Sequence, residues 1–186
     1  MLMTLIGLMA MTLPLQAQQG NEPERINAIW DAANTRIAQQ VDIWFQDGEF
    51  PMCVQLLCFQ AELNPHDYEI VTNLGWMYEN IERPAEAEVI YTGYQKNNPK
   101  DPDATLPIAQ YWFLHKKYDK VIAILAGHLL PKTHPNNYRM LALSLEKVNR
   151  LEESAATWKQ MLKLYPDQPA TQMNLDRVNK KIADKK

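Results

Sequence analysis

Two cysteines and four histidines are the residues of this chain that could hold a metal ion or form a covalent cross-link. Cys53 and Cys58 are five residues apart in a segment that is expected to be helical. At about 1.5 Å rise per residue their Cα atoms would lie roughly 8–9 Å apart, which is too far for a disulfide. The histidines share no spacing with the cysteines or with one another: His66, His115, His128 and His134. We therefore expect no disulfide, no metal site and no cofactor, and we interpret the cysteines as small buried side chains.

The short motifs that assemble catalytic sites are also missing from the sequence. It has no glycine-rich phosphate loop, no Gly-x-Ser-x-Gly elbow and no His-Glu-x-x-His pair. Catalytic groups can be brought together from distant positions, so this absence does not exclude catalysis by itself. Since no pair of carboxylates has an obvious shared site either, we expect that the chain is not an enzyme.

A pattern of small, apolar and proline residues recurs about every 34 residues along most of the chain. It is clearest in one segment, which carries Leu74, Gly75, Tyr78, Ala87, Tyr91 and Pro99. One position of the pattern always holds a short side chain: Val41, Gly75, Ala109 and Ala142. A short side chain lets two helices approach closely, and a proline ends the second helix of the pair. This pattern resembles the tetratricopeptide repeat (TPR) family, whose repeats are helix-turn-helix units.

The resemblance covers residues 34–168 and implies an all-α fold, a right-handed α-solenoid of about four units. We place the units at 34–67, 68–101, 102–134 (one residue short) and 135–168. Residues 18–33 would extend the first helix, and residues 169–186 would form a helix that caps the last unit. We expect the first helix of the third unit to begin near Leu106, with Pro107 in its first turn. A generic helical bundle with chance matches is the alternative.

In TPR proteins the first helix of each unit lines a concave groove, and its exposed side chains select the ligand. Carrying the register across gives these groove residues: Asp42, Phe45, Glu69, Thr72, Trp76, Glu79, Leu106, Gln110, Phe113, Arg139, Leu143 and Glu146. The aromatic side chains are candidate anchors, and the carboxylates outnumber the single arginine. The resemblance therefore implies a non-catalytic protein-interaction scaffold that binds a peptide or protein segment with apolar and basic side chains.

A groove of this kind can also serve two other purposes. Cochaperone members of the family bind an acidic C-terminal tail through Lys, Asn and Arg side chains. Here Asn73 occupies one clamp-like position, but Ala38, Asp103 and Pro107 stand where basic residues are expected, so a chaperone-tail clamp is not implied. The remaining alternative is a self-associating scaffold whose groove is covered by its own helix or by another copy, so a homo-oligomer stays open.

The charge distribution bears on the class of partner. The net charge of the chain is −3, and residues 176–186 are nevertheless basic, so the body of the protein is mildly acidic. A nucleic-acid-binding protein would instead carry a basic stripe, and we expect no nucleic-acid partner. The basic residues at the end of the chain suit the C-terminus of a helix.

The first twenty residues have a different character. They contain no charged side chain, and Leu2 to Leu13 is almost continuously apolar. Pro14 and the following Leu15-Gln16-Ala17 resemble the end of a secretory signal peptide, with cleavage after Ala17. We expect an exported protein, located in the periplasm, the cell envelope or outside the cell. Because no Lys or Arg precedes the apolar run, an uncleaved membrane anchor formed by residues 1–17 is the alternative, and a buried helix is a third.

Overall fold

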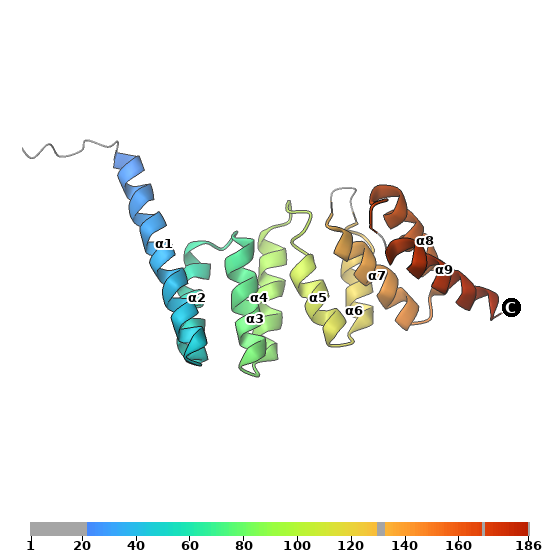
Figure 1. Cartoon of the computed structure of the whole chain (residues 1–186), viewed down its shortest axis with the longest axis horizontal. Helices are drawn as coiled ribbons and strands as arrows, with labels where there is room; N and C mark the ends of the chain where they lie inside the picture. Colours follow the sequence, from blue (N-terminus) through green and yellow to red (C-terminus); the bar gives the residue numbers. More distant parts are fainter. Residues whose placement is uncertain (1–21, 130–132, 169, 186) are drawn as a thin grey trace, which may run out of the picture. The chain divides into compact units, whose positions relative to one another are not determined.

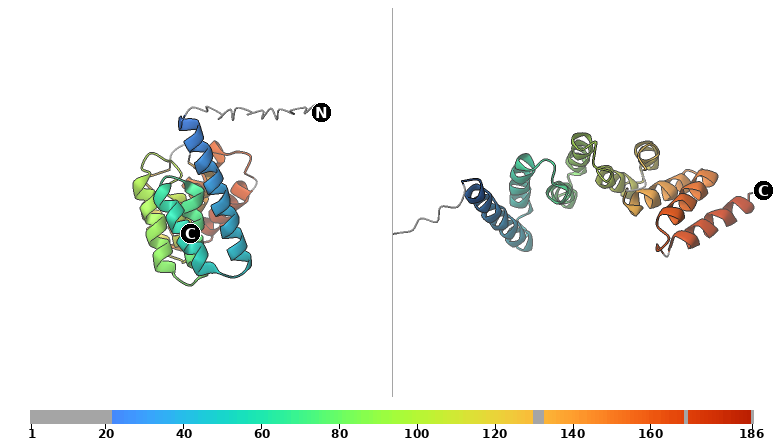
Figure 2. Two further views of the ribbon diagram at one scale, coloured as in Figure 1. Left: turned by 90° about the vertical axis from the view of Figure 1, so that its left-hand side faces the viewer. Right: turned by 90° about the horizontal axis from the view of Figure 1, so that it is seen from above.

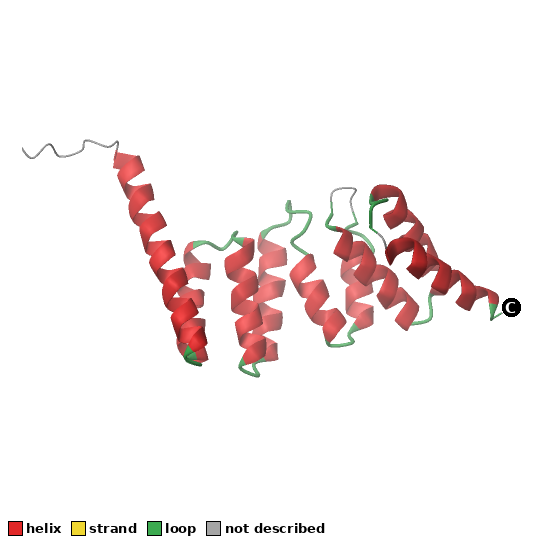
Figure 3. Ribbon diagram, in the orientation of Figure 1, coloured by secondary structure: helices red, strands yellow, loops and turns green. Residues whose placement is uncertain are grey.

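The computed structural model describes residues 22–129, 133–168 and 170–185, and these segments are helical with short connecting turns (Figures 1 and 3). The helices are α1 (Glu22–Gln46), α2 (Phe50–Leu63), α3 (Tyr68–Asn80), α4 (Pro84–Asn97), α5 (Leu106–Leu114), α6 (Tyr118–Leu125), α7 (Pro135–Lys147), α8 (Leu151–Leu164) and α9 (Ala170–Ala183). The described ranges contain no strand. The prediction of an all-α fold is confirmed.

The chain divides into two compact units, residues 1–40 and 41–186. The described part of the first unit is the N-terminal portion of α1, which contains no buried residue. The predicted leader, residues 1–17, lies outside the described residues. Among the helices that are described, none has both the length and the apolar character needed to span a bilayer.

In the second unit the helices pack in chain order, each against the next, as Figure 2 also shows. The pairs α3–α4, α5–α6 and α7–α8 each fall inside one of the predicted repeat units, and α9 packs on α8. Five clusters of buried apolar side chains run along the stack between successive helices. A helix pair of this kind buries its apolar face only by stacking on neighbours, which the described helices do.

The turn between the two helices of each pair repeats in detail. The second of its three residues has a positive φ in every case: Gly48, Glu82, Lys116 and Asn149. In the turn after α3, the Glu82 amide donates to the Glu79 carbonyl oxygen at 3.2 Å, and the Arg83 amide donates to that of Tyr78 at 2.9 Å. These two bonds form the Schellman motif that ends a helix. The same pair of bonds recurs in the other three turns. The interval between the last two positive-φ residues, Lys116 and Asn149, is one residue shorter than the other intervals. It lies where the third unit was predicted to be one residue short.

Close approach of paired helices explains the small side chains of the repeat. A Cβ atom built on Gly75 would overlap the ring of Tyr91, which is itself buried. In the fourth unit the corresponding residues, Ala142 and Trp158, are both buried in one cluster. Glycine opposite a tyrosine and alanine opposite a tryptophan are thus two ways to fit a large ring between two helices.

A second repeated contact joins the same helices through a polar atom. The Cys53 thiol lies 3.4 Å from the Val41 carbonyl oxygen, and the Ser154 hydroxyl donates to the Ala142 carbonyl oxygen at 2.7 Å. Cys53 and Ser154 occupy equivalent positions of the first and fourth units. Both cysteines are free thiols, and Cys53 is fully buried. The interpretation of Cys53 as a small buried side chain is therefore confirmed, whereas Cys58 is only half-buried and its thiol lies 3.5 Å from the Tyr78 hydroxyl.

Candidate partner-binding groove

A hollow of about 420 Å³ lies between α3 and α5. We call it the α3–α5 hollow. Its lining residues are Tyr68, Thr72, Asn73, Trp76, Glu79, Asn80, Tyr91, Pro107, Gln110, Tyr111 and Leu114. Four of the predicted groove residues are among them, namely Thr72, Trp76, Glu79 and Gln110. The structure therefore brings together predicted residues from two successive units.

The helical period of α3 decides which of its side chains reach the hollow. One face of α3 is buried in the stack and carries Val71, Leu74, Gly75 and Met77. Thr72, Trp76 and Glu79 lie on the neighbouring face of α3, which remains open. The start of α3 is fixed by Asp67, whose side chain accepts hydrogen bonds from the amides of Glu69 and Ile70.

Helix α5 forms the wall of the hollow opposite α3. This helix begins at Leu106, with Pro107 in its first turn, as predicted. Because a proline has no amide hydrogen, its place in the first turn removes no helical hydrogen bond. Gln110 and Leu114 are exposed on this wall, one helical turn apart.

Trp76 is the largest exposed side chain of the hollow. It is 47% exposed, and its ring centroid lies 5.6 Å from that of Phe45 on α1. Phe45 in turn packs edge-on against Phe50 at 5.5 Å. Aromatic pairs of this spacing form rigid apolar surfaces that lose little conformational entropy when a ligand covers them. Phe45 and Trp76 together are therefore the apolar anchor of the candidate groove.

Polar groups surround this anchor. The Tyr91 hydroxyl donates to Oε1 of Glu79 at 2.9 Å, and Asn80 Nδ2 donates to the Trp76 carbonyl oxygen at 2.7 Å. Burial, with the adjacent Glu79 charge, raises the pKa of Tyr91, so its phenol remains a hydrogen-bond donor at neutral pH. The Asn73 side chain is exposed at the rim. The hollow thus offers one carboxylate and amide groups to a ligand.

Further along the stack the predicted groove does not stay open. Leu106 is 8% exposed and belongs to the core cluster between α5, α6 and α7, so its assignment to the groove is wrong. Phe113 and Leu143 are half-buried and pack against core clusters. The apolar ridge is therefore confined to Phe45 and Trp76, while Arg139 is exposed on α7.

Glu146 is also unavailable to a ligand. Its side chain is 6% exposed and forms ion pairs with Arg177 and, at 2.7 Å, Lys181 of α9. Burial disfavours the charged form, but the two hydrogen bonds outweigh it and hold the pKa of Glu146 below its ordinary value. Glu146 was predicted as a groove carboxylate because the pattern could not show that α9 covers it.

Several residues that line the hollow were not among the predicted groove residues. Asn80 and Leu114 are 34 residues apart and occupy the same position of α3 and α5, as do Asn73 and Pro107. Asn73 and Pro107 were considered only as clamp positions, and extending the groove register to the position of Asn80 and Leu114 would have found that pair. The described residues contain no group of three or more His, Cys, Asp or Glu side chains able to hold a metal ion.

Comparison with known proteins supports the fold. No protein-family model and no curated protein matches the sequence. MamA (41-end) from Desulfovibrio magneticus RS-1 is 16% identical with a TM-score of 0.61, and the match covers 81% of this chain and 85% of that chain. A MamA RS-1 double mutant is 16% identical with a TM-score of 0.62, and the match covers 81% of this chain and 85% of that chain. A crystal structure of MamA protein is 14% identical with a TM-score of 0.61, and the match covers 78% of this chain and 80% of that chain. At identities this low the likeness shows the fold alone, which is a TPR-like helical solenoid.

Proposed function

We propose that the protein is a non-catalytic scaffold that holds a peptide or protein segment in the α3–α5 hollow. The observation that carries the proposal is the convergence of Thr72, Trp76, Glu79 and Gln110 on one hollow. An exposed aromatic side chain beside convergent polar groups is the usual composition of a protein-binding surface. The MamA structures share the fold, and they support the architecture of the scaffold and not the identity of its partner.

The side chains of the hollow indicate the chemistry of the ligand. Trp76 and Phe45 offer an apolar face, which suits a Leu, Met or aromatic side chain. Glu79 lies in the hollow, while Glu69 and Asp42 are exposed on α3 and α1. These carboxylates favour a lysine or arginine next to the apolar residue. The amides of Asn73 and Asn80 suit the peptide groups of an extended ligand.

A peptide library selected on the full chain tests this proposal. Enriched sequences should combine an apolar residue with Lys or Arg, and the best should bind with a measurable Kd by calorimetry. The variant Trp76→Ala should weaken that binding by about 30-fold, as loss of an anchor does. The matched control is Met173→Ala on α9, another exposed apolar residue outside the hollow. Equal affinity of Trp76→Ala and wild type, or selection of acidic sequences, would contradict the proposal.

Export is a separate proposal that rests on the sequence of residues 1–17. The apolar run and the small residue at Ala17 support a cleaved leader. Expression of the chain in a bacterial host, followed by N-terminal sequencing of the exported fraction, should give a product that begins at Gln18. An intact Met1 in the membrane fraction would instead indicate the membrane-anchored alternative. An intact chain in the cytoplasm would contradict both.

A further inference from the structure

Helix α2 has the composition of a buried helix. Of its fourteen residues only Glu62 is charged. Its buried side carries Cys53, Val54, Leu57 and Gln60. Yet a second apolar row runs along another side of the same helix: Met52, Leu56, Phe59 and Leu63. These residues have the spacing i, i+4, i+7, i+11 and form a continuous face, which we call the α2 stripe.

The α2 stripe is open in the structure. Phe59 is 49% exposed, Met52 and Leu63 are similarly exposed, and Leu56 is half-buried. A helix that is apolar on more than one side is normally covered on each of them, because leaving rows of leucine, methionine and phenylalanine in contact with water costs free energy. Single exposed apolar residues need no explanation, but three exposed residues in register with a half-buried one on one face do.

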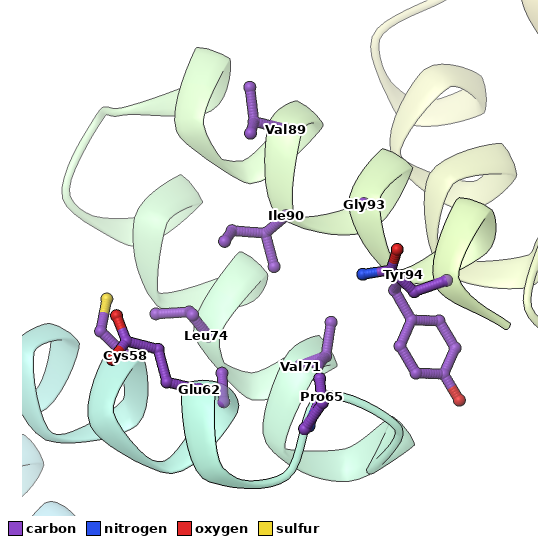
Figure 4. Close-up of a pocket in the computed structure, with 11 residues that line it drawn as sticks. Cys58, Glu62, Pro65, Val71, Leu74, Val89, Ile90, Gly93 and Tyr94 are labelled. Atoms are coloured by element: carbon purple, nitrogen blue, oxygen red, sulfur yellow. The ribbon is translucent and has the colours of Figure 1, made fainter.

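The stripe faces away from the later repeats. On its other side, α2 borders α4 across a hollow of about 330 Å³ to which it contributes Cys58, Ala61 and Glu62 (Figure 4). At about 100° per residue, Phe59 lies on the opposite side of α2 from Ala61. The stripe therefore occupies the place where the second helix of a preceding repeat would pack, at the start of the stack.

The end of the stack is finished differently. There α9 buries Thr171, Leu175 and Val178 against α7 and α8, and its outer side carries exposed charged residues such as Asp176 and Lys180. Repeat arrays need such polar terminal helices to remain soluble. The described residues of α2 provide no equivalent polar face at the start of the stack.

We propose that the α2 stripe is a docking surface for a second copy of this chain, with the two stripes packed antiparallel about a two-fold axis. In that arrangement Met52 faces Leu63 of the second copy and Leu56 faces Phe59, so the stripe is complementary to itself. It carries no charge that would repel its own copy. Glu62 of each copy comes to lie near the positive end of the other α2 helix dipole. This interface is separate from the α3–α5 hollow.

The molar mass of the full chain across a range of concentrations tests this interface. Sedimentation equilibrium should show a monomer–dimer equilibrium, and Phe59→Glu should raise the dimer dissociation constant by about 30-fold or more. Its melting temperature, measured at a concentration where both proteins are monomeric, should match that of the wild type. The matched control Val89→Glu changes a residue of α4 that is 70% exposed, and it should leave the dimer intact.

A charge exchange sharpens the test of the antiparallel geometry. Met52→Lys and Leu63→Glu should each weaken self-association, because a charge then faces an apolar residue. A mixture of these two variants should dimerise more strongly than either alone, because the new lysine faces the new carboxylate. No gain on mixing would overturn the antiparallel arrangement.

Three results would overturn the proposal as a whole. One is a monomeric wild type at all concentrations. In that case a lower melting temperature of Phe59→Glu would point to coverage of the stripe within one chain. The second is loss of the dimer in Val89→Glu but not in Phe59→Glu. The third is loss of the dimer only in Ile29→Glu, which would place the interface on the exposed apolar residues of α1. Measuring the peptide affinity of Phe59→Glu distinguishes failure of this interface from failure of the groove, because Phe59 lies outside the α3–α5 hollow.

Discussion

The second and fourth repeat units place the same kinds of residues at the same positions, yet they present different surfaces. Glu79 and Glu146 occupy equivalent positions, as do Trp76 and Leu143. Glu79 remains beside the α3–α5 hollow, where it accepts a hydrogen bond from Tyr91. Glu146 is covered by α9 and neutralised by Arg177 and Lys181. The position within a repeat therefore sets the direction of a side chain, while the neighbouring helix decides whether a ligand can reach it.

The largest expected effect separates a core tryptophan of the fourth unit from the groove tryptophan of the second. Trp158 is 1% exposed in a core cluster, so Trp158→Ala should lower the free energy of unfolding by about 3–5 kcal/mol. Trp76→Ala should lower it by less than about 1 kcal/mol, because half of that ring already faces solvent. Urea denaturation of both variants measures the difference. Similar losses would place Trp76 in the core and remove the groove.

The next effect concerns the close approach of α3 and α4. Gly75→Leu should lower the free energy of unfolding by about 3 kcal/mol, since the new side chain must displace the buried Tyr91 ring. The control is Gly93→Ala in α4, whose new Cβ would meet no atom. It should stabilise the protein by about 0.5–1 kcal/mol through helix propensity. A melting temperature of Gly75→Leu close to that of the wild type would show that the helices are not so close.

The ion pairs of α9 should contribute a smaller amount. Glu146→Gln should lower the free energy of unfolding by about 1–2 kcal/mol, because it weakens the charged hydrogen bonds with Arg177 and Lys181. The loss stays this small because both cations can regain water. Glu153→Gln is the control, because its pair with Arg150 is exposed and should contribute nothing measurable. If Glu146→Gln has no effect, α9 is held by its apolar contacts alone.

Acid should weaken both regions through their carboxylates. Hydrogen bonds from Lys117, Lys120 and Trp112 outweigh burial and lower the pKa of Glu88 to about 2, and the pKa of Glu146 is lowered too. Below the ordinary carboxyl pKa of about 4.3, the unfolded chain therefore binds more protons at these carboxylates than the folded chain does. The stability from Glu88 should be fully present above that pH and be lost towards pH 2, by about 2 kcal/mol. Glu88→Gln should flatten this decline in the urea midpoint.

The smallest effect comes from a turn. Lys116 has a φ of 58°, a backbone conformation that favours glycine. Lys116→Gly should stabilise the protein by about 0.5–1 kcal/mol, while Lys116→Ala should give no gain because alanine bears the same strain. Thermal unfolding followed by circular dichroism measures both. Destabilisation by Lys116→Gly would mean that the lysine side chain makes a stabilising contact.

The fold was predictable from the sequence because its determinants are local and periodic. Gly75 and Tyr91 are sixteen residues apart, and the size of each explains the other. The open groove was predictable only in part. Trp76 and Gln110 depend on the register of one or two helices, whereas the burial of Glu146 depends on α9, some thirty residues further along. The exposure of a repeat position cannot be derived from the repeat that contains it.

The packing of helices in chain order has a consequence for how the protein folds. The closely packed pairs of described helices are neighbours or next neighbours along the chain, such as α3 with α4 and α5 with α7. No long loop has to close before these contacts form, and proteins with mainly local contacts fold quickly. The early helices can therefore pack while later ones are still being synthesised on the ribosome. The last contacts to form, and the first to open in hydrogen exchange, should be those of α9.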